Sequence, residues 1–417
     1  GAFPSVNAGQ EPYIWAGFDL WGHANEAAID IESLSVYEFA DFVGVDTENR
    51  PVQTRYTYAN DDEKYRLAVQ LFDDGDYYNA YLLLEELSGY DTGETYLEEC
   101  ERLLQTVPLD GWALANGIAT SMMNSGTPLS QYLYVYQAEA LETLDLANWE
   151  VMDLDFIRYF PNLKELILDG NAITDLTPLK DLYALERLSL AENGVADLTP
   201  LANLTNLQSL NLSDNVIDDV SCLGNLSRLK ELDLSVNNIH SLDGLYALTE
   251  LETVDLSYNF ISSVNALGNS KLRELNIVNT NINSLWAVSE LTTLEVLKAG
   301  YYYERVDDAD TYMLDKKYRS DSTVAHTLTG MEAISGLTNL RTLYLSSLST
   351  QTMQPLSGLA KLESLTLYSY SGPTDYNVLG GLTGLKELSL DGAGGGFDSL
   401  HFLLSLTNLE TLEIGGG

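Results

Sequence analysis

The sequence predicts an α/β repeat solenoid, a curved array with a parallel β-sheet on its concave face, preceded by a small α-helical domain. Three observations support this fold class. Leucine-rich segments recur about every 22 residues from Leu141 onward in the 417-residue chain. Each segment first alternates polar and apolar residues, as does a strand with one exposed face. Apolar residues then recur at every third position, as in a 3₁₀ turn, and units this short must stack to bury them.

Twelve units share this pattern, and they begin at Leu141, Leu163, Leu185, Leu207, Leu229, Leu251, Leu272, Leu294, Leu340, Leu362, Leu385 and Leu409. In the unit that starts at Leu185, apolar residues occupy positions 1, 4, 6, 11, 14, 17 and 20. Position 9 carries asparagine in five consecutive units, at Asn171, Asn193, Asn215, Asn237 and Asn259. Because a buried amide both donates and accepts, we expect these side chains to form a ladder that satisfies backbone groups in the turns.

The pattern LxxLxLxxNxIxxLxxLxxLxx over residues 141–417 resembles the leucine-rich repeat proteins. It is most similar to the 22-residue class found in bacterial internalins and in a eukaryotic phosphatase-regulating subunit. The resemblance implies recognition of a protein or peptide through the concave face, without chemistry. It also implies a bacterial protein that is secreted or displayed at the cell surface.

The concave face can be assigned from the alternation within each strand. Unit positions 3, 5 and 7 are expected to point outward, because they alternate with buried positions 4 and 6. Small and acidic residues predominate in the N-terminal repeats and tyrosines in the C-terminal ones, and tyrosine offers a large amphipathic contact area at low entropy cost. We therefore predict a ligand-binding surface that comprises Tyr258, Tyr301, Tyr302, Tyr344, Tyr368, Tyr370, Asp233 and Asp255.

The eighth unit departs from the repeat length, with about 24 extra residues in an insertion at 301–330. One interpretation is a tolerated surface loop, since lengthening a loop adds little closure entropy. The other is a contact element beside the concave face, because the insertion begins with three consecutive tyrosines. A calcium site is a further alternative to a solvated acidic loop, and its candidate ligands are Glu304, Asp307, Asp308 and Asp310.

Residues 61–107 are predicted to be helical. Asp61 or Asp62 is the expected cap of the first helix, and Asp76 is expected to open the second. The string AxxLFxxGDYxxA from Ala68 to Ala80 resembles one tetratricopeptide unit, with its turn glycine at Gly75.

This helical region has two alternative roles. It is either a cap on the exposed end of the solenoid, which such arrays require, or a second peptide-binding site. Residues 1–60 form an N-terminal segment whose sequence pattern indicates no clear structure. Residues 108–140 are expected to connect the helical region to the repeats or to cap the repeat array. At the other end of the chain, the last strand is expected to be an open edge or the place of a truncation.

Charge and composition narrow the classes of partner. The chain carries 21 Lys and Arg against 62 Asp and Glu, a net charge of −41, which disfavours nucleic acids and anionic membrane surfaces. Cys100 and Cys222 are too few for a disulfide framework or a CxxC site. No apolar run reaches the length of a membrane span, and an anchor, if the protein has one, is expected upstream of residue 1.

The sequence contains no recognisable catalytic motif. Its four histidines are scattered, and neither HExxH, GxSxG nor a phosphate-binding glycine loop is present. We therefore predict no catalytic residue, no metal ligand and no cofactor, and interpret the chain as a binding module for a protein or peptide. Two alternatives remain open: a carbohydrate-binding surface module, since aromatic faces also stack on sugars, and an intracellular regulatory subunit of an enzyme.

Overall fold

The computed structural model describes residues 60–87, 93–109, 112–124, 132–301, 327–373, 375–392 and 399–416. The chain divides into two compact units. The first comprises residues 1–149 and 155–163, and the second comprises residues 150–154 and 164–417. None of the described helices combines the length and hydrophobicity that a bilayer crossing requires.

Most of the described residues of the first unit are helical. Its elements are α2 (Asp61–Asp73), α3 (Tyr77–Glu85), α4 (Gly93–Leu103), α5 (Trp112–Asn124), α6 (Val135–Glu139), β1 (Thr143–Asp145) and the 3₁₀ helix η2 (Asp155–Tyr159). Helices α2, α3 and α4 pack around a small core that includes Ala68, Ala80 and Cys100, each fully buried. Gly75 lies in the turn between α2 and α3 with φ of +83°, a conformation that strongly favours glycine.

The predicted cap of the first helix is wrong by one residue. Asn60 has extended backbone dihedrals, and its side chain accepts a hydrogen bond of 2.9 Å from the amide of Glu63. Asp61 and Asp62 instead lie in the first turn, where their charge favours the helix dipole. Asp76 does cap α3, because its carboxylate accepts a hydrogen bond from the amide of Asn79.

Helix α5 covers β1 within the first unit. A Cβ atom added at Gly117 would lie 2.9 Å from side-chain atoms of Leu146 and Trp149, so only glycine permits this close approach. The hydroxyl of Ser121 accepts a hydrogen bond of 2.9 Å from the amide of Asp145. A helix side chain thus satisfies a backbone group of this strand.

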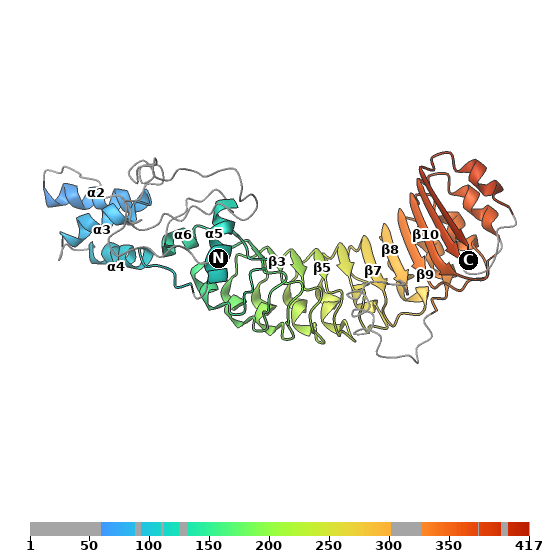
Figure 1. Ribbon diagram of the computed structural model, residues 1–417, viewed down its shortest axis with the longest axis horizontal. Coiled ribbons are helices and arrows are strands. Elements are labelled where there is room, and N and C mark those ends of the chain that lie inside the picture. The colour runs from blue at the N-terminus through green and yellow to red at the C-terminus, as the bar shows by residue number, and fades with distance from the viewer. Residues whose placement is uncertain are drawn as a thin grey trace, which may run out of the picture. The chain divides into compact units, whose positions relative to one another are not determined.

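The second unit is a leucine-rich repeat solenoid, which confirms the predicted fold class. Strands β2 to β12 of this unit form a parallel sheet in sequence order. Figure 1 shows the strands of the second unit side by side on the inner side of its bend, with the 3₁₀ turns on the other side. Its strands are β2 (Glu165–Ile167), β3 (Arg187–Ser189), β4 (Ser209–Asn211), β5 (Glu231–Asp233), β6 (Thr253–Asp255), β7 (Glu274–Val278), β8 (Val296–Gly300), β9 (Thr342–Ser346), β10 (Ser364–Tyr370), β11 (Glu387–Gly392) and β12 (Thr411–Gly416).

A 3₁₀ helix follows each strand from β2 to β11. These helices are η3 (Thr177–Asp181), η4 (Thr199–Asn203), η5 (Ser221–Asn225), η6 (Asp243–Ala247), η7 (Asn265–Leu267), η8 (Leu285–Val288), η9 (Met331–Gly336), η10 (Gln354–Gly358), η11 (Tyr376–Gly381) and η12 (His401–Ser405). Leucines of neighbouring strands pair in register, as do Leu210 and Leu232, and each of these two is 1% exposed. The core is therefore continuous from one unit to the next.

The five asparagines of position 9 bind backbone groups in two neighbouring units. Asn237 is fully buried, and its amide group donates to the carbonyls of Leu212, Leu234 and Ser235 at 2.9–3.1 Å. Its side-chain oxygen accepts a hydrogen bond of 3.0 Å from the amide of Ile217. The side chain thus fastens its own turn to that of the preceding unit.

This linkage changes after Asn259. Thr280 occupies position 9 of the next unit, and within the described residues its hydroxyl bonds to Ile277 and Ile282 of the same turn and not to the preceding unit. The strands also lengthen at this point, from three residues in β6 to five in β7.

We predict that Asn237→Ala destabilises the array by roughly 3 kcal/mol or more, because it leaves several buried backbone groups without a partner. The measurement is chemical denaturation followed by circular dichroism. The neighbouring Asn238 is the matched control: it is partly exposed, and Asn238→Ala should change the free energy of unfolding by less than about 0.5 kcal/mol. Equal losses for the two variants would contradict the role of the ladder.

Candidate binding face

We define the concave face as the surface formed by unit positions 3, 5 and 7 of the sheet. Tyr344 at position 5 of β9 pairs with Thr366 on β10, and Ser346 at position 7 pairs with Tyr368. Tyr344 and Tyr368 are therefore diagonal neighbours on this face, and both are partly exposed. Tyr258 is also partly exposed and lies beyond the end of β6, with a left-handed φ of +55°.

Two of the predicted contact residues are buried, which corrects their placement on the face. Tyr301 is 4% exposed, and its hydroxyl donates a hydrogen bond of 3.3 Å to the carbonyl of Ile282. Tyr370 is 3% exposed, and its ring packs edge-to-face on Tyr376 at a centroid distance of 6.4 Å. Burial is also the main cause that raises the pKa of the Tyr370 hydroxyl.

The backbone of the turns explains both errors. Tyr370 occupies position 9, where the asparagines of earlier units point into the core. In most units a left-handed residue at position 8 precedes that inward position, as at Val236. In the eighth unit the left-handed residue is Gly300 at position 7, with φ of +107°, so Tyr301 takes the inward place one residue early. Tyr302 lies outside the described residues, as does most of the insertion.

Asp233 and Asp255 are register partners on β5 and β6 and are partly exposed. Each carboxylate accepts hydrogen bonds from the amide and the hydroxyl of the serine two residues later, at 2.6–2.9 Å. A second oxygen of Asp255 accepts a hydrogen bond of 2.7 Å from Asn276. Burial raises the pKa of Asp233; its bonds to Ser235 act in the opposite direction, and the charge of Asp255 raises it further. These carboxylates therefore support the turns as well as facing outward.

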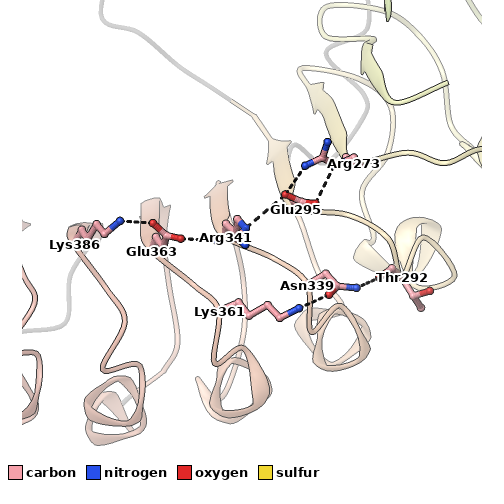
Figure 2. Close-up of polar contacts among 8 residues, drawn as sticks. All are labelled: Arg273, Thr292, Glu295, Asn339, Arg341, Lys361, Glu363 and Lys386. Carbon is pink, nitrogen blue, oxygen red and sulfur yellow. Dashed lines mark hydrogen bonds and ion pairs between the residues drawn. The ribbon is translucent and has the colours of Figure 1, made fainter. Parts of the chain in front are cut away.

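Sequence reasoning missed a ladder of alternating charge at unit position 2, shown in Figure 2. Arg273 forms two hydrogen bonds of 2.9 and 3.0 Å with Glu295, and Arg341 lies 3.5 Å from the same carboxylate. Arg341 also pairs with Glu363 at 2.7 Å, and Lys386 pairs with Glu363 at 2.5 Å. The sign alternation at this position was the available signal: Lys230, Glu252, Arg273, Glu295, Arg341, Glu363, Lys386 and Glu410.

The ladder joins the repeats of β8 and β9, although residues 301–341, which include the insertion, separate these strands in sequence. A second row of contacts does the same: the Asn339 side chain donates to the carbonyl of Thr292 at 3.0 Å and accepts from Lys361 at 2.7 Å. The strands themselves pair from Val296↔Thr342 to Gly300↔Ser346. The eighth and ninth repeats therefore stack like any other neighbouring pair.

The described residues show no arrangement typical of a metal or nucleophile site. Within them, no cluster of three or more His, Cys, Asp or Glu side chains can hold a metal ion. The calcium ligands considered in the insertion lie outside the described residues. Cys100 and Cys222 are both free, and burial raises the pKa of their thiols to about 12 and about 11. Neither thiol is therefore an activated nucleophile at neutral pH.

Comparisons with known proteins agree with this architecture. A family model described as leucine-rich repeats (2 copies) matches residues 184–225 and 227–269. A solved internalin (InlF) from Listeria monocytogenes is 24% identical, with a TM-score of 0.53, over 75% of this chain and 96% of that chain. A TDR receptor structure is 19% identical, with a TM-score of 0.52, over 68% of this chain and 49% of that chain. No curated protein gives a significant match. At these identities the structural likeness shows the fold alone, which is the leucine-rich repeat solenoid.

We predict that Glu295→Gln lowers the melting temperature more at pH 7 than at roughly pH 3. The hydrogen bond from Arg273 holds the pKa of Glu295 below its ordinary value of 4.5. A carboxylate whose pKa is lowered by folding stabilises the protein above its unfolded pKa, and this contribution is lost as the pH falls through the lower folded value. The measurement is thermal unfolding of wild type and variant at both pH values.

Glu290→Gln provides the control, because Glu290 is exposed and has no ion-pair partner in the described part of the chain. It should leave the melting temperature unchanged at pH 7. A loss for Glu295→Gln that persists undiminished at roughly pH 3 would contradict the ion-pair origin of the effect.

Proposed function

We propose that this chain is a non-catalytic recognition module that binds a protein or peptide on its concave face, centred on Tyr344 and Tyr368. The observation that carries the proposal is the placement of these two tyrosines as diagonal neighbours on adjacent strands. Both residues are partly exposed, so each keeps area that a ligand can cover, although the hydroxyl oxygen of Tyr344 is itself buried. Strands about 4.8 Å apart bring such side chains within reach of a single ligand segment.

The physical character of tyrosine supports the choice of this region. Its rigid ring and polar hydroxyl give a large contact area with little loss of conformational entropy, and it is enriched among the residues that dominate binding energy. Tyr258 and the pair Asp233 and Asp255 extend the proposed surface toward the N-terminal repeats. Tyr301 and Tyr370 are not part of it, because they are buried.

We further propose that the protein acts at the bacterial cell surface or after secretion. This part rests on the resemblance of the repeats to internalins. A cytosolic enzyme that co-purifies with the chain would instead support the regulatory-subunit alternative.

We predict that Tyr368→Ser and Tyr344→Ser each weaken ligand binding about tenfold or more while the melting temperature changes little. Twelve-residue peptides selected from a random displayed library on the intact protein serve as probes, and fluorescence anisotropy gives their dissociation constants. Tyr183→Ser is the control, because Tyr183 is 54% exposed but lies next to η3, away from the strands.

The proposal would be overturned by selected peptides whose affinity changes with neither Tyr344→Ser nor Tyr368→Ser, or changes equally with Tyr183→Ser. Absence of any selectable peptide, together with glycan-array binding abolished by Tyr344→Ser, would support the carbohydrate-binding alternative instead.

A further inference from the structure

Lys298 is an exposed cation within the concave face. It occupies position 5 of β8, and its register partners are Asn276 on β7 and Tyr344 on β9. Unlike the cations of the charge ladder, it forms no ion pair or hydrogen bond in the described part of the chain. Within the described residues no acidic group neutralises this ammonium, so its charge is available to a ligand on a chain whose net charge is −41.

Position 7 of the same strand carries no side chain. Gly300 has φ of +107°, and a Cβ atom added there would lie 2.0 Å from the carbonyl oxygen of Ser346. Two independent constraints thus require glycine at this place. The result is a fixed bare position on the face, next to Lys298 along β8 and next to Ser346 across the sheet.

Ser346 carries a second group that lacks a partner. The residue is fully buried, and its hydroxyl forms no hydrogen bond within the described residues. Polar groups in protein interiors are nearly always hydrogen-bonded, and exceptions call for an explanation such as a functional role. Ser346 lies between Gly300 and Tyr368 in the position-7 row. Since positions 5 and 7 share one face, this hydroxyl and Lys298 are diagonal neighbours there.

We propose that Lys298 and Ser346 form a carboxylate-binding subsite of the concave face, flanked by Tyr344 and Tyr368. The inference rests on the proposed function and names the chemistry of the ligand at one point. The ammonium group of Lys298 supplies a charge-assisted hydrogen bond to one carboxylate oxygen, and the hydroxyl of Ser346 donates to the other. Gly300 and Ser346 are both buried, so access of the ligand carboxylate to the Ser346 hydroxyl requires the flanking tyrosine side chains to rotate.

The strands on the N-terminal side of β8 indicate which ligand group lies next to the bound carboxylate. Asp255 lies at position 5 of β6, two strands from Lys298, which corresponds to about 10 Å at the usual strand spacing. An extended peptide covers this distance in about three residues. A cationic ligand residue about three positions from the carboxylate therefore faces Asp255.

The experiment is a double-mutant cycle with the library-selected peptides. Each peptide is resynthesised with one carboxylate neutralised at a time, either as Glu→Gln and Asp→Asn or as a C-terminal amide, so that side-chain and terminal carboxylates are distinguished. Dissociation constants are measured on wild type and on Lys298→Met. We expect neutralisation of one carboxylate to weaken binding about tenfold on wild type and to have little further effect on Lys298→Met.

Two further variants sharpen the test. Lys180→Met makes the same change in net charge at an exposed lysine of η3 and should bind the peptides like wild type. Ser346→Ala should weaken binding several-fold without lowering the melting temperature, because the hydroxyl it removes has no partner in the described residues.

Additive losses from carboxylate neutralisation and Lys298→Met would overturn the subsite, as would equal losses for Lys298→Met and Lys180→Met. Peptides that depend on Tyr344 and Tyr368 but on no carboxylate would overturn the subsite and leave the proposed function standing. Peptides that depend on neither tyrosine would overturn both.

Discussion

The in-register stacking of leucines between neighbouring units is the constraint on which the rest of this structure depends. A single 22-residue unit has too little interior to bury its own apolar side chains, so each unit is stable only against its neighbours. Leu210 and Leu232 show the result, since each is 1% exposed and pairs with its counterpart across the sheet. The same stacking aligns every outward position of one strand with that of the next. The concave face is therefore a product of the core.

The backbone groups of the turns are satisfied in different ways along the array, and this difference sets the chemistry of the face. In β5 and β6 the position-5 carboxylates of Asp233 and Asp255 accept hydrogen bonds from the backbone amides two residues later. Each strand ends at its aspartate. From β8 onward the strands continue, and pairing across the sheet extends to Gly300 and Ser346. The side chain at position 5 then no longer has to accept a hydrogen bond from the backbone, so this position can carry Lys298 and Tyr344.

The sequence was sufficient for the fold because the signal was periodic and repeated over twelve units. It was insufficient wherever one unit departed from the average. The shift of the left-handed residue to Gly300 displaces Tyr301 into the core, and no averaged pattern contains that shift. The charge ladder has the opposite character: its signal is periodic in the sequence, but it lies at position 2, outside the outward positions 3, 5 and 7 from which binding residues are predicted.

The charge ladder also affects how the concave face attracts ligands. Arg273, Arg341 and Lys386 are paired with glutamates, so these cations do not offset the excess of acidic side chains that gives the chain its net charge of −41. At physiological ionic strength that field decays within about 8 Å, whereas a hydrogen bond to Lys298 acts at contact. Long-range attraction therefore favours a ligand with net positive charge, and short-range chemistry at Lys298 favours a carboxylate within it. The two requirements together describe a ligand segment of mixed charge rather than an acidic one.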